Sequence, residues 1–313
     1  MRKWKVFLAI SFLALFVLNQ SVFAASKFVW ETRKIEAIYN GQKINFPDQR
    51  PFLDSANRVQ IPVRFVSEAL GAKVGWSDDT KTVTIQQGNK RIVLVVGNKQ
   101  ATVNGKTVKF DTAAQYRKGR VFVPIRFVSE ALGESVSWDP FSQYVWVGEK
   151  RVPNTDDDKF KLRAIDDFKA YYKDSEYLLE NFVKEPYQGI KVIRRSDLPI
   201  QLGKGRVIYS IDVVRKDGEK FLAIRSSDSG LPIYFMVKND YPKYRREVTV
   251  STEWHSDGTV TSYYPEKSTL DVLVNGKFLD IDWKKFDMKT ADYIGFRADF
   301  PREYIVVMEN PFK

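Results

Sequence analysis

The chain has 313 residues, enough for two or three domains, and 43% of them are hydrophobic, which is enough to build real cores. It contains 50 Lys and Arg against 39 Asp and Glu, a net charge of +11, and no cysteine. The absence of cysteine excludes disulfides, a lipoprotein anchor through cysteine and thiolate metal sites.

The first 24 residues have the layout of a secretory signal peptide. A basic start with Arg2 and Lys5 precedes an apolar run from Val6 to Leu18. Val22 to Ala24 then offers a cleavage site, and the apolar run is shorter than the ~20 residues of a spanning helix. We therefore expect a mature chain from about Ala25 that is secreted, stays with the cell envelope and does not span the membrane. An uncleaved N-terminal anchor is the alternative. Nucleic acid is not an expected partner of an exported chain.

An internal repeat follows. IPVRFVSEALG at 61–71 returns as VPIRFVSEALG at 123–133, and 13 of the 19 residues from Arg58 to Trp76 are identical 62 positions later. In each copy a strand of alternating apolar residues meets a proline, Pro62 or Pro124, that suits the first turn of a helix. The helix is too short to be stable alone, so we expect it to lie against a sheet.

The spacing of apolar residues in the helix of the first copy predicts an apolar face that contains Val66 and Leu70, and a polar face that contains Ser67. The arginine and glutamate four residues apart on each helix are interpreted as structural ion pairs. The glycine that ends each helix is a C-cap. We expect Trp76 and Trp138 to close the core over the helix; stacking on sugar rings is the alternative. The residues expected to define the repeat are Pro62, Arg64, Phe65, Glu68, Leu70, Gly71, Trp76, Pro124, Arg126, Phe127, Glu130, Leu132, Gly133 and Trp138.

Hairpin signals precede both copies, Asn40-Gly41 and Asn104-Gly105, and an x-V-x-W strand follows each helix. This pattern resembles the copper amine oxidase N-terminal-like domain, a "stalk" module that is often duplicated in exported proteins of Gram-positive bacteria. The resemblance covers about residues 35–148 and implies a small antiparallel sheet wrapped on a helix. It does not imply the oxidase reaction, which needs an Asn-Tyr-Asp/Glu site and three histidines. The chain has no Asn-Tyr dipeptide and one histidine, His255. We expect no catalytic, cofactor-binding or metal residues, and no cofactor.

A Pro-, Asn- and Asp-rich stretch at 152–158 predicts a boundary. We expect a stalk domain at 25–150, a linker and helix at 151–188, with the helix from Phe160 to Val183, and a β-rich domain of unidentified family at 189–313. Asp217-Gly218, Asp257-Gly258 and Asn275-Gly276 predict hairpins in the last part. The predicted fold class is α+β: two repeated small units of antiparallel sheet plus one helix, a long helix, and a mostly antiparallel β domain.

Charge is concentrated on the repeat region. Residues 25–150 hold 19 Lys and Arg and 12 Asp and Glu, a net charge of +7, whereas residues 151–313 have a net charge of +1. A basic exported surface attracts anionic polymers, although ordinary solubility charge is the alternative. We expect a secreted, non-catalytic envelope protein whose stalk is a spacer or wall-binding module. Its expected partner is an anionic cell-wall polymer or peptidoglycan, and the stalk presents the β-rich domain. The alternative is a wall-targeted hydrolase with paired carboxylates in the C-terminal domain, where Glu253, Asp257, Asp280 and Asp282 are available.

Overall fold

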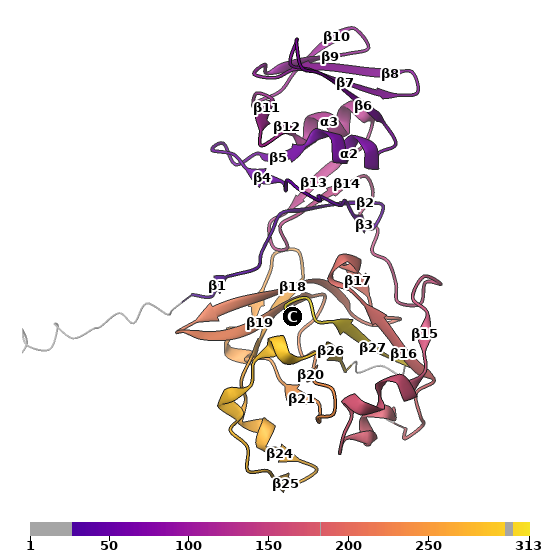
Figure 1. Ribbon diagram of the computed structural model, residues 1–313, viewed down its shortest axis with the longest axis vertical. Coiled ribbons are helices and arrows are strands. Elements are labelled where there is room, and N and C mark those ends of the chain that lie inside the picture. The colour runs from indigo at the N-terminus through magenta and orange to yellow at the C-terminus, as the bar shows by residue number, and fades with distance from the viewer. Residues whose placement is uncertain (1–26, 182, 298–302) are drawn as a thin grey trace, which may run out of the picture.

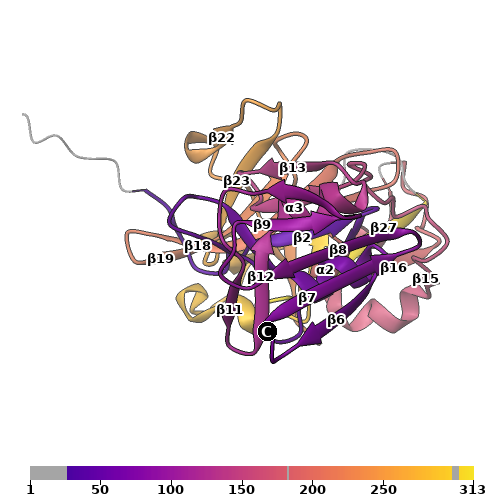
Figure 2. The same ribbon diagram turned by 90° about the horizontal axis from the view of Figure 1, so that it is seen from above.

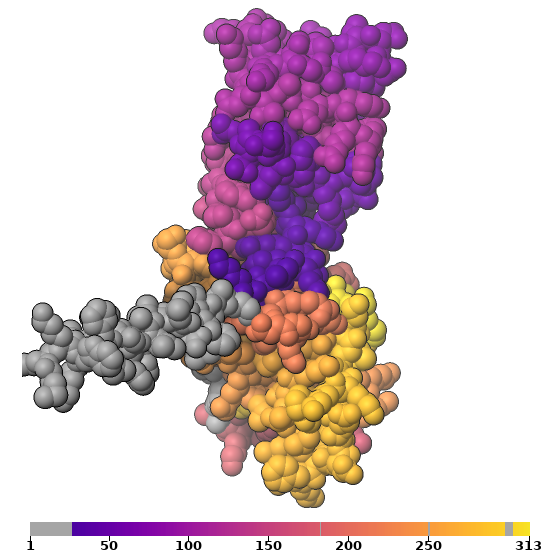
Figure 3. Space-filling view, turned by 90° about the vertical axis from the view of Figure 1, so that its left-hand side faces the viewer, coloured from indigo at the N-terminus to yellow at the C-terminus, as the bar shows by residue number. Residues whose placement is uncertain are grey.

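The computed structural model describes residues 27–181, 183–297 and 303–313, so the predicted signal peptide lies outside the described residues. Two bodies stack along the long axis (Figure 1). The upper one, the stalk, is built from residues 36–147, and the lower one, the sandwich, from residues 29–30 and from 151 onward. In the space-filling view the stalk is a column that rises from the sandwich (Figure 3), and from above it lies over the sandwich (Figure 2).

Both repeat copies contain a strand, a helix and two closing strands in the same order. The first copy has β5 (Val59–Pro62), α2 (Val63–Ala69), β6 (Lys73–Ser77) and β7 (Thr82–Gln87). The second has β12 (Arg120–Pro124), α3 (Ile125–Leu132), β13 (Val136–Asp139) and β14 (Tyr144–Val147). The other stalk strands are β2 (Glu36–Tyr39), β3 (Gln42–Lys43), β4 (Phe52–Leu53), β8 (Lys90–Val95), β9 (Gln100–Val103), β10 (Lys106–Lys109) and β11 (Gln115–Arg117).

The copies are interleaved, which differs from the two self-contained units that the repeat predicts. Strands β5 and β12 pair with each other in a middle sheet of order β11-β12-β5-β4. The first copy's closing strands join a distal sheet, β10-β9-β8-β7-β6, and the second copy's join a proximal sheet, β13-β14-β2-β3. The hairpin that precedes each copy therefore lies in the sheet of the other copy. The period of the repeat shows the unit, but the pairing between copies depends on contacts far apart in sequence.

Strand β8 breaks the symmetry between these two sheets. In the proximal sheet β14 pairs directly with β2, in parallel. In the distal sheet β8 lies between the corresponding strands β7 and β9 and is antiparallel to both. After the second copy the chain leaves for the sandwich, so no strand equivalent to β8 follows β14.

The two sheets also differ in what covers their outer faces. The outward positions of β7 are Thr82 and Thr84, which are partly exposed. The same positions of β14 are Tyr144 and Trp146, which are buried, and they cluster with Ile38 of β2 on the face turned to the sandwich. Burial of large aromatic side chains stabilises such a contact by a few kcal/mol. The second copy is therefore the one that docks.

Helices α2 and α3 lie between the distal and proximal sheets over one shared stalk core, which contains Val66, Leu70 and Leu132. Ser67, predicted on the polar face, is instead fully buried, as is its counterpart Ser129. The helices face each other, so a helix that reads as one-sided in the sequence is covered on two sides.

The sandwich consists of two facing sheets with a core between them, in which Ile211 and Leu222 of one sheet meet Phe235 and Val306 of the other. One sheet contains β1 (Val29–Trp30), β17 (Ile200–Gln201), β18 (Val207–Lys216), β19 (Glu219–Ser226), β22 (Glu253–Trp254) and β23 (Val260–Pro265). The other contains β15 (Leu162–Arg163), β16 (Gly189–Ile193), β20 (Ile233–Met236), β21 (Lys243–Arg245), β26 (Tyr293–Phe296) and β27 (Tyr304–Glu309).

A small hairpin of β24 (Leu273–Val274) and β25 (Lys277–Phe278) lies at the far end. All three predicted hairpins of this half form, and pairing is mostly antiparallel. The remaining single-turn helices are η3 (Arg195–Asp197), η4 (Thr249–Ser251), η5 (Thr269–Val272), η6 (Trp283–Lys285) and η7 (Met288–Thr290).

The long helix predicted from Phe160 to Val183 is wrong. The described part of that stretch contains β15 and two short 3₁₀ helices, η1 (Ile165–Tyr171) and η2 (Glu176–Leu179). Asp174 has a positive φ of 53°, which interrupts any continuous helix. Phe168 and Tyr172 are buried, so the apolar period reflects contact with the sandwich. Thr155, in the predicted boundary stretch, bonds Tyr304 through its buried hydroxyl.

Candidate functional site

The motif residues mark the strand-to-helix corners of the stalk. Pro62 and Pro124 are buried N-caps, and Gly71 and Gly133 follow the helices with φ of 81° and 101°.

The predicted ion pairs, Arg64–Glu68 and Arg126–Glu130, are present at 3.9 Å and partly exposed, so each contributes only a few tenths of a kcal/mol. Phe65 and Phe127 make matching ring contacts, with Phe46 at 6.0 Å and Phe110 at 4.5 Å.

The two tryptophans of the motif do not share one environment. Trp76 packs against the stalk core, and the ring of Tyr116 stacks on it at 5.8 Å with the planes 12° apart. Around it is a small depression of about 170 Å³, the Trp76 pocket. Trp138 is 36% exposed, so the prediction that both tryptophans close the core holds only for Trp76.

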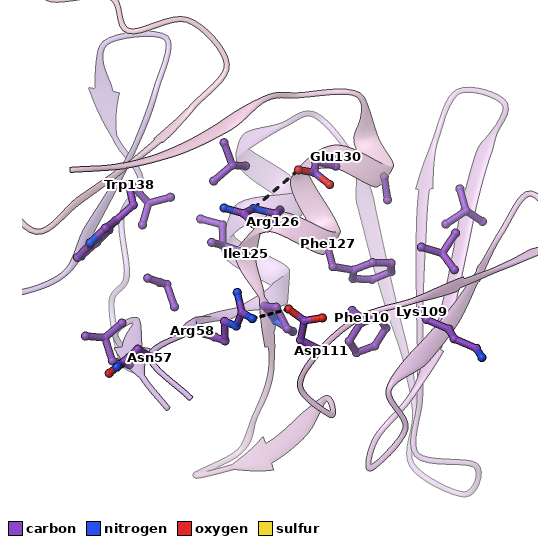
Figure 4. A pocket seen from close by; sticks show the side chains of 18 residues that line it. Asn57, Arg58, Lys109, Phe110, Asp111, Ile125, Arg126, Phe127, Glu130 and Trp138 are labelled. Atoms are coloured by element: carbon purple, nitrogen blue, oxygen red, sulfur yellow. Dashed lines mark ion pairs between the residues drawn. The ribbon is translucent and has the colours of Figure 1, made fainter. Parts of the chain in front are cut away.

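Trp138 lines a much larger cavity, the Trp138 groove, of about 770 Å³. Figure 4 shows Trp138 at one end of this groove, Phe110 and Phe127 toward the other, and charged side chains between them. The apolar part of the lining comes from Leu53, Val59, Val103, Val108, Phe110, Pro124, Ile125, Phe127, Ala131, Val136, Trp138 and Val145. A volume of this size, an apolar lining and a few polar groups are typical of ligand sites.

Four of the five charged side chains that line the groove form two ion pairs. Arg58 bonds Asp111 at 2.7 Å, and Arg126 lies 3.9 Å from Glu130 (Figure 4). All four are at least 45% exposed, so these pairs add little stability. Because each arginine faces a carboxylate, this part of the groove carries almost no net charge. The fifth charged residue, Lys109, forms no ion pair with the residues that the structure describes and lies at the end away from Trp138 (Figure 4).

The distal sheet carries a different kind of surface. From residue 80 to residue 110 the sequence contains six Lys and Arg and no Asp or Glu. Lys73, Arg91, Lys99 and Lys106 are exposed there, and none forms an ion pair with the residues that the structure describes. Lys81 is paired, with Asp78 at 2.9 Å. The stalk therefore ends in a cationic face far from the sandwich (Figure 1), and the two acids of its sheet, Asp78 and Asp79, lie together in the turn between β6 and β7.

The junction between stalk and sandwich centres on Arg225, which is 2% exposed. Its guanidinium bonds Asp139 of the stalk at 2.5 Å and also bonds Ser142 and Asp257. His255 is half-buried and stacks on Phe141 at 4.3 Å. No sequence signal at Asp139 or Arg225 indicates this network, because the partners are 86 residues apart and belong to different domains.

The carboxylates that were candidates for hydrolysis are spread out. Asp257 is held by Arg225, Asp280 and Asp282 lie in exposed chain after β25, and Glu253 is exposed.

A different acid pair, Glu266 and Asp287, lies close together in a cavity of about 340 Å³ that also contains several lysines. Hydrogen bonds outweigh partial burial there and lower the pKa of Asp287, whereas a general acid needs a raised pKa.

Among the described residues, no three His, Cys, Asp or Glu side chains are grouped so that they could hold a metal ion. No helix in the described part of the chain has the length and apolar character to cross a membrane. Stalk and sandwich together thus define a two-body β protein whose open sites are surfaces and grooves.

Residues 38–147 match the family model of the copper amine oxidase N-terminal domain, so the stalk carries this domain, as its motif predicts. No curated protein matches the chain.

Proposed function

We propose that this is a secreted, non-catalytic envelope protein whose stalk binds an anionic cell-wall polymer. The observation that carries the proposal is the cationic distal sheet: residues 80–110 hold six basic residues and no carboxylate, and the acids of this sheet, Asp78 and Asp79, are confined to the turn between β6 and β7. Exposed cations that lack local partners attract a polyanion over about 10 Å at ordinary ionic strength. The predicted export signal supports a location where such polymers occur.

The structure supports a binding role for the stalk more than a passive spacer role. A spacer needs only length, yet this module ends in a clustered charge and contains an open groove. Hydrolysis by the sandwich is less well supported, because the pKa of Asp287 in its acid pair with Glu266 is lowered, whereas a general acid needs a raised one.

Retention of the mature full-length chain on purified cell wall, over a salt series, tests this function. The test variant carries Lys73→Gln, Arg91→Gln and Lys99→Gln, all on the distal sheet. The control carries Lys204→Gln, Lys238→Gln and Lys289→Gln, which are exposed on the sandwich. Because each cation near an anionic surface contributes about 1 kcal/mol, we expect the test variant to bind roughly 10- to 100-fold more weakly at low salt.

The control triple variant should be retained like the wild type, and added salt should release both. Equal loss in both triple variants would mean that only net charge matters and that the distal sheet is not the contact. Absence of wild-type retention at low salt would reject wall binding and leave the stalk as a spacer.

A further inference from the structure

The Trp138 groove and the Trp76 pocket are the same site in two copies of the repeat. Nine of the eleven residues that line the Trp76 pocket have a counterpart in the groove. Their counterparts, in the order pocket then groove, are Pro62/Pro124, Val63/Ile125, Arg64/Arg126, Val74/Val136, Trp76/Trp138, Val83/Val145, Gly119/Asn57, Arg120/Arg58 and Val121/Val59. Even the ion pair recurs, because Arg120 contacts Asp48 as Arg58 contacts Asp111.

The Trp76 pocket is filled and the Trp138 groove is open because the two sites differ at one position, which is Tyr116 in the pocket and Leu53 in the groove. Tyr116 on β11 pairs with Val121, and Leu53 on β4 pairs with Val59 at the equivalent place. Tyrosine at this position lays its ring on Trp76. Leucine cannot, and Leu53 remains 42% exposed while Trp138 stays uncovered. The groove therefore matches the Trp76 pocket in its other lining residues but lacks the ring that stacks on the tryptophan.

The groove's own chemistry restricts what could supply that ring. Near Trp138 its two arginines already face carboxylates, and Lys109 lies at the opposite end (Figure 4), so the part of the groove beside the indole offers no net charge to a phosphate or a carboxylate ligand. An acyl chain would cover these four exposed charged groups, removing them from water without offering them a hydrogen bond. A pyranose fits both features, because its C–H face packs on an indole while its hydroxyls bond donors and acceptors at the ring edge.

We propose that the Trp138 groove binds a neutral pyranose ring of an oligosaccharide, stacked on Trp138 where Tyr116 stacks on Trp76. Arg58, Asp111 and Asn57 are placed to bond its hydroxyls. This assignment deepens the proposed function and rests on it for the source of the sugar, the glycan strands of the wall. The distal sheet would capture the polymer by charge, and the groove would recognise an uncharged unit.

The deciding variant is Leu53→Tyr, which supplies the missing ring from the protein itself. Position 53 is exposed, so the added ring does not disturb the core. The probe is a soluble tetrasaccharide of N-acetylglucosamine, with the full mature chain as receptor, followed by calorimetry and tryptophan fluorescence. We expect binding by the wild type and a loss of about tenfold or more in both Leu53→Tyr and Trp138→Ala. The matched control, Trp76→Phe, should bind like the wild type because its site is already filled.

Unchanged sugar binding by Leu53→Tyr, or no sugar binding by the wild type at millimolar concentration, would overturn the assignment. So would binding of a tyrosine-containing peptide in place of the sugar, since the ring would then come from a protein. The two proposals fail separately. Wall retention that depends on the distal lysines without sugar binding removes only the groove, and sugar binding without wall retention removes only the wall-binding function.

Discussion

Two buried serines show how a single side chain can depart from the pattern of its helix. Ser67 and Ser129 occupy the same place in α2 and α3, are fully buried, and have hydroxyl oxygens without a hydrogen-bond partner among the described residues. The amphipathic pattern places them correctly off the main apolar face. It could not show that the second helix covers that face, because this depends on how the copies interleave.

Replacing either serine by alanine should stabilise the protein. A buried hydroxyl without a partner costs about 1–3 kcal/mol, and alanine is also the better helix former. We expect Ser129→Ala to raise the free energy of unfolding by about 1 kcal/mol, measured by chemical denaturation. Ser256→Ala, at an exposed turn, should change nothing. A loss of stability in Ser129→Ala would show that the hydroxyl is hydrogen-bonded after all.

At the scale of the strand, the sequence indicates which of the two copies has a covered outer face. The alternation of β7 and β14 gives β-branched apolar residues at the first two inward positions of each strand. The outward residues are Thr82 and Thr84 in one copy and Tyr144 and Trp146 in the other. That contrast alone indicates that the second copy is covered. The sequence could not show that the sandwich covers this face, nor that the Trp138 groove exists. Both features depend on pairing between strands that are far apart in the sequence.

Loss of the Arg225 guanidinium should weaken the junction strongly. Removing one partner of a buried pair leaves the other charge without compensation, which costs about 3–5 kcal/mol. Arg225→Ala should therefore lower the free energy of unfolding by roughly 3 kcal/mol, because Asp139 is only 8% exposed. Arg215→Ala, which breaks the more exposed pair with Glu31, should cost less than about 1 kcal/mol. Similar losses in both variants would contradict a special role for Arg225.

His255 should make the same junction sensitive to mild acid. Burial first, then the positive charge of Arg225, lowers the pKa of His255 below its ordinary value of 6.5. Between that lowered pKa and 6.5 the unfolded chain binds a proton that the folded chain does not, so stability falls as pH falls through this window. Denaturation midpoints from pH 7.5 to 5 should decline more in the wild type than in His255→Gln. Parallel curves would assign the acid sensitivity to other groups.

At the scale of the whole molecule, the stalk is an insertion into the sandwich. Strand β1 pairs with β18 before the chain enters the stalk, and β15 pairs with β16 after it leaves. Contacts from both bodies then fix the junction: the Tyr144 hydroxyl donates to the Tyr209 carbonyl at 2.8 Å, and Lys43 donates to the Arg195 carbonyl at 3.0 Å. The sequence repeat shows where the stalk is, but only the strand pairing shows that it interrupts another domain.

An isolated stalk should therefore not behave as an independent soluble domain. A fragment of residues 35–150 would expose Ile38, Tyr144 and Trp146, which the sandwich covers in the full chain. We expect it to self-associate in size-exclusion chromatography with light scattering, because large apolar patches drive association. The fragment with Tyr144→Thr and Trp146→Thr, which copies the outer face of β7, should be monomeric. Monomeric behaviour of the unmodified fragment would show that the docking face is not what makes it associate.

The insertion also decides how the molecule would carry tension. A load on a stalk attached to a wall polymer divides between two peptide connections that run in parallel, one on either side of residues 36–147. A pull on the amino end acts elsewhere, on the two residue pairs that join β1 to β18. Under such a load β1 would detach from β18 first, and the contact between the stalk and its ligand would remain.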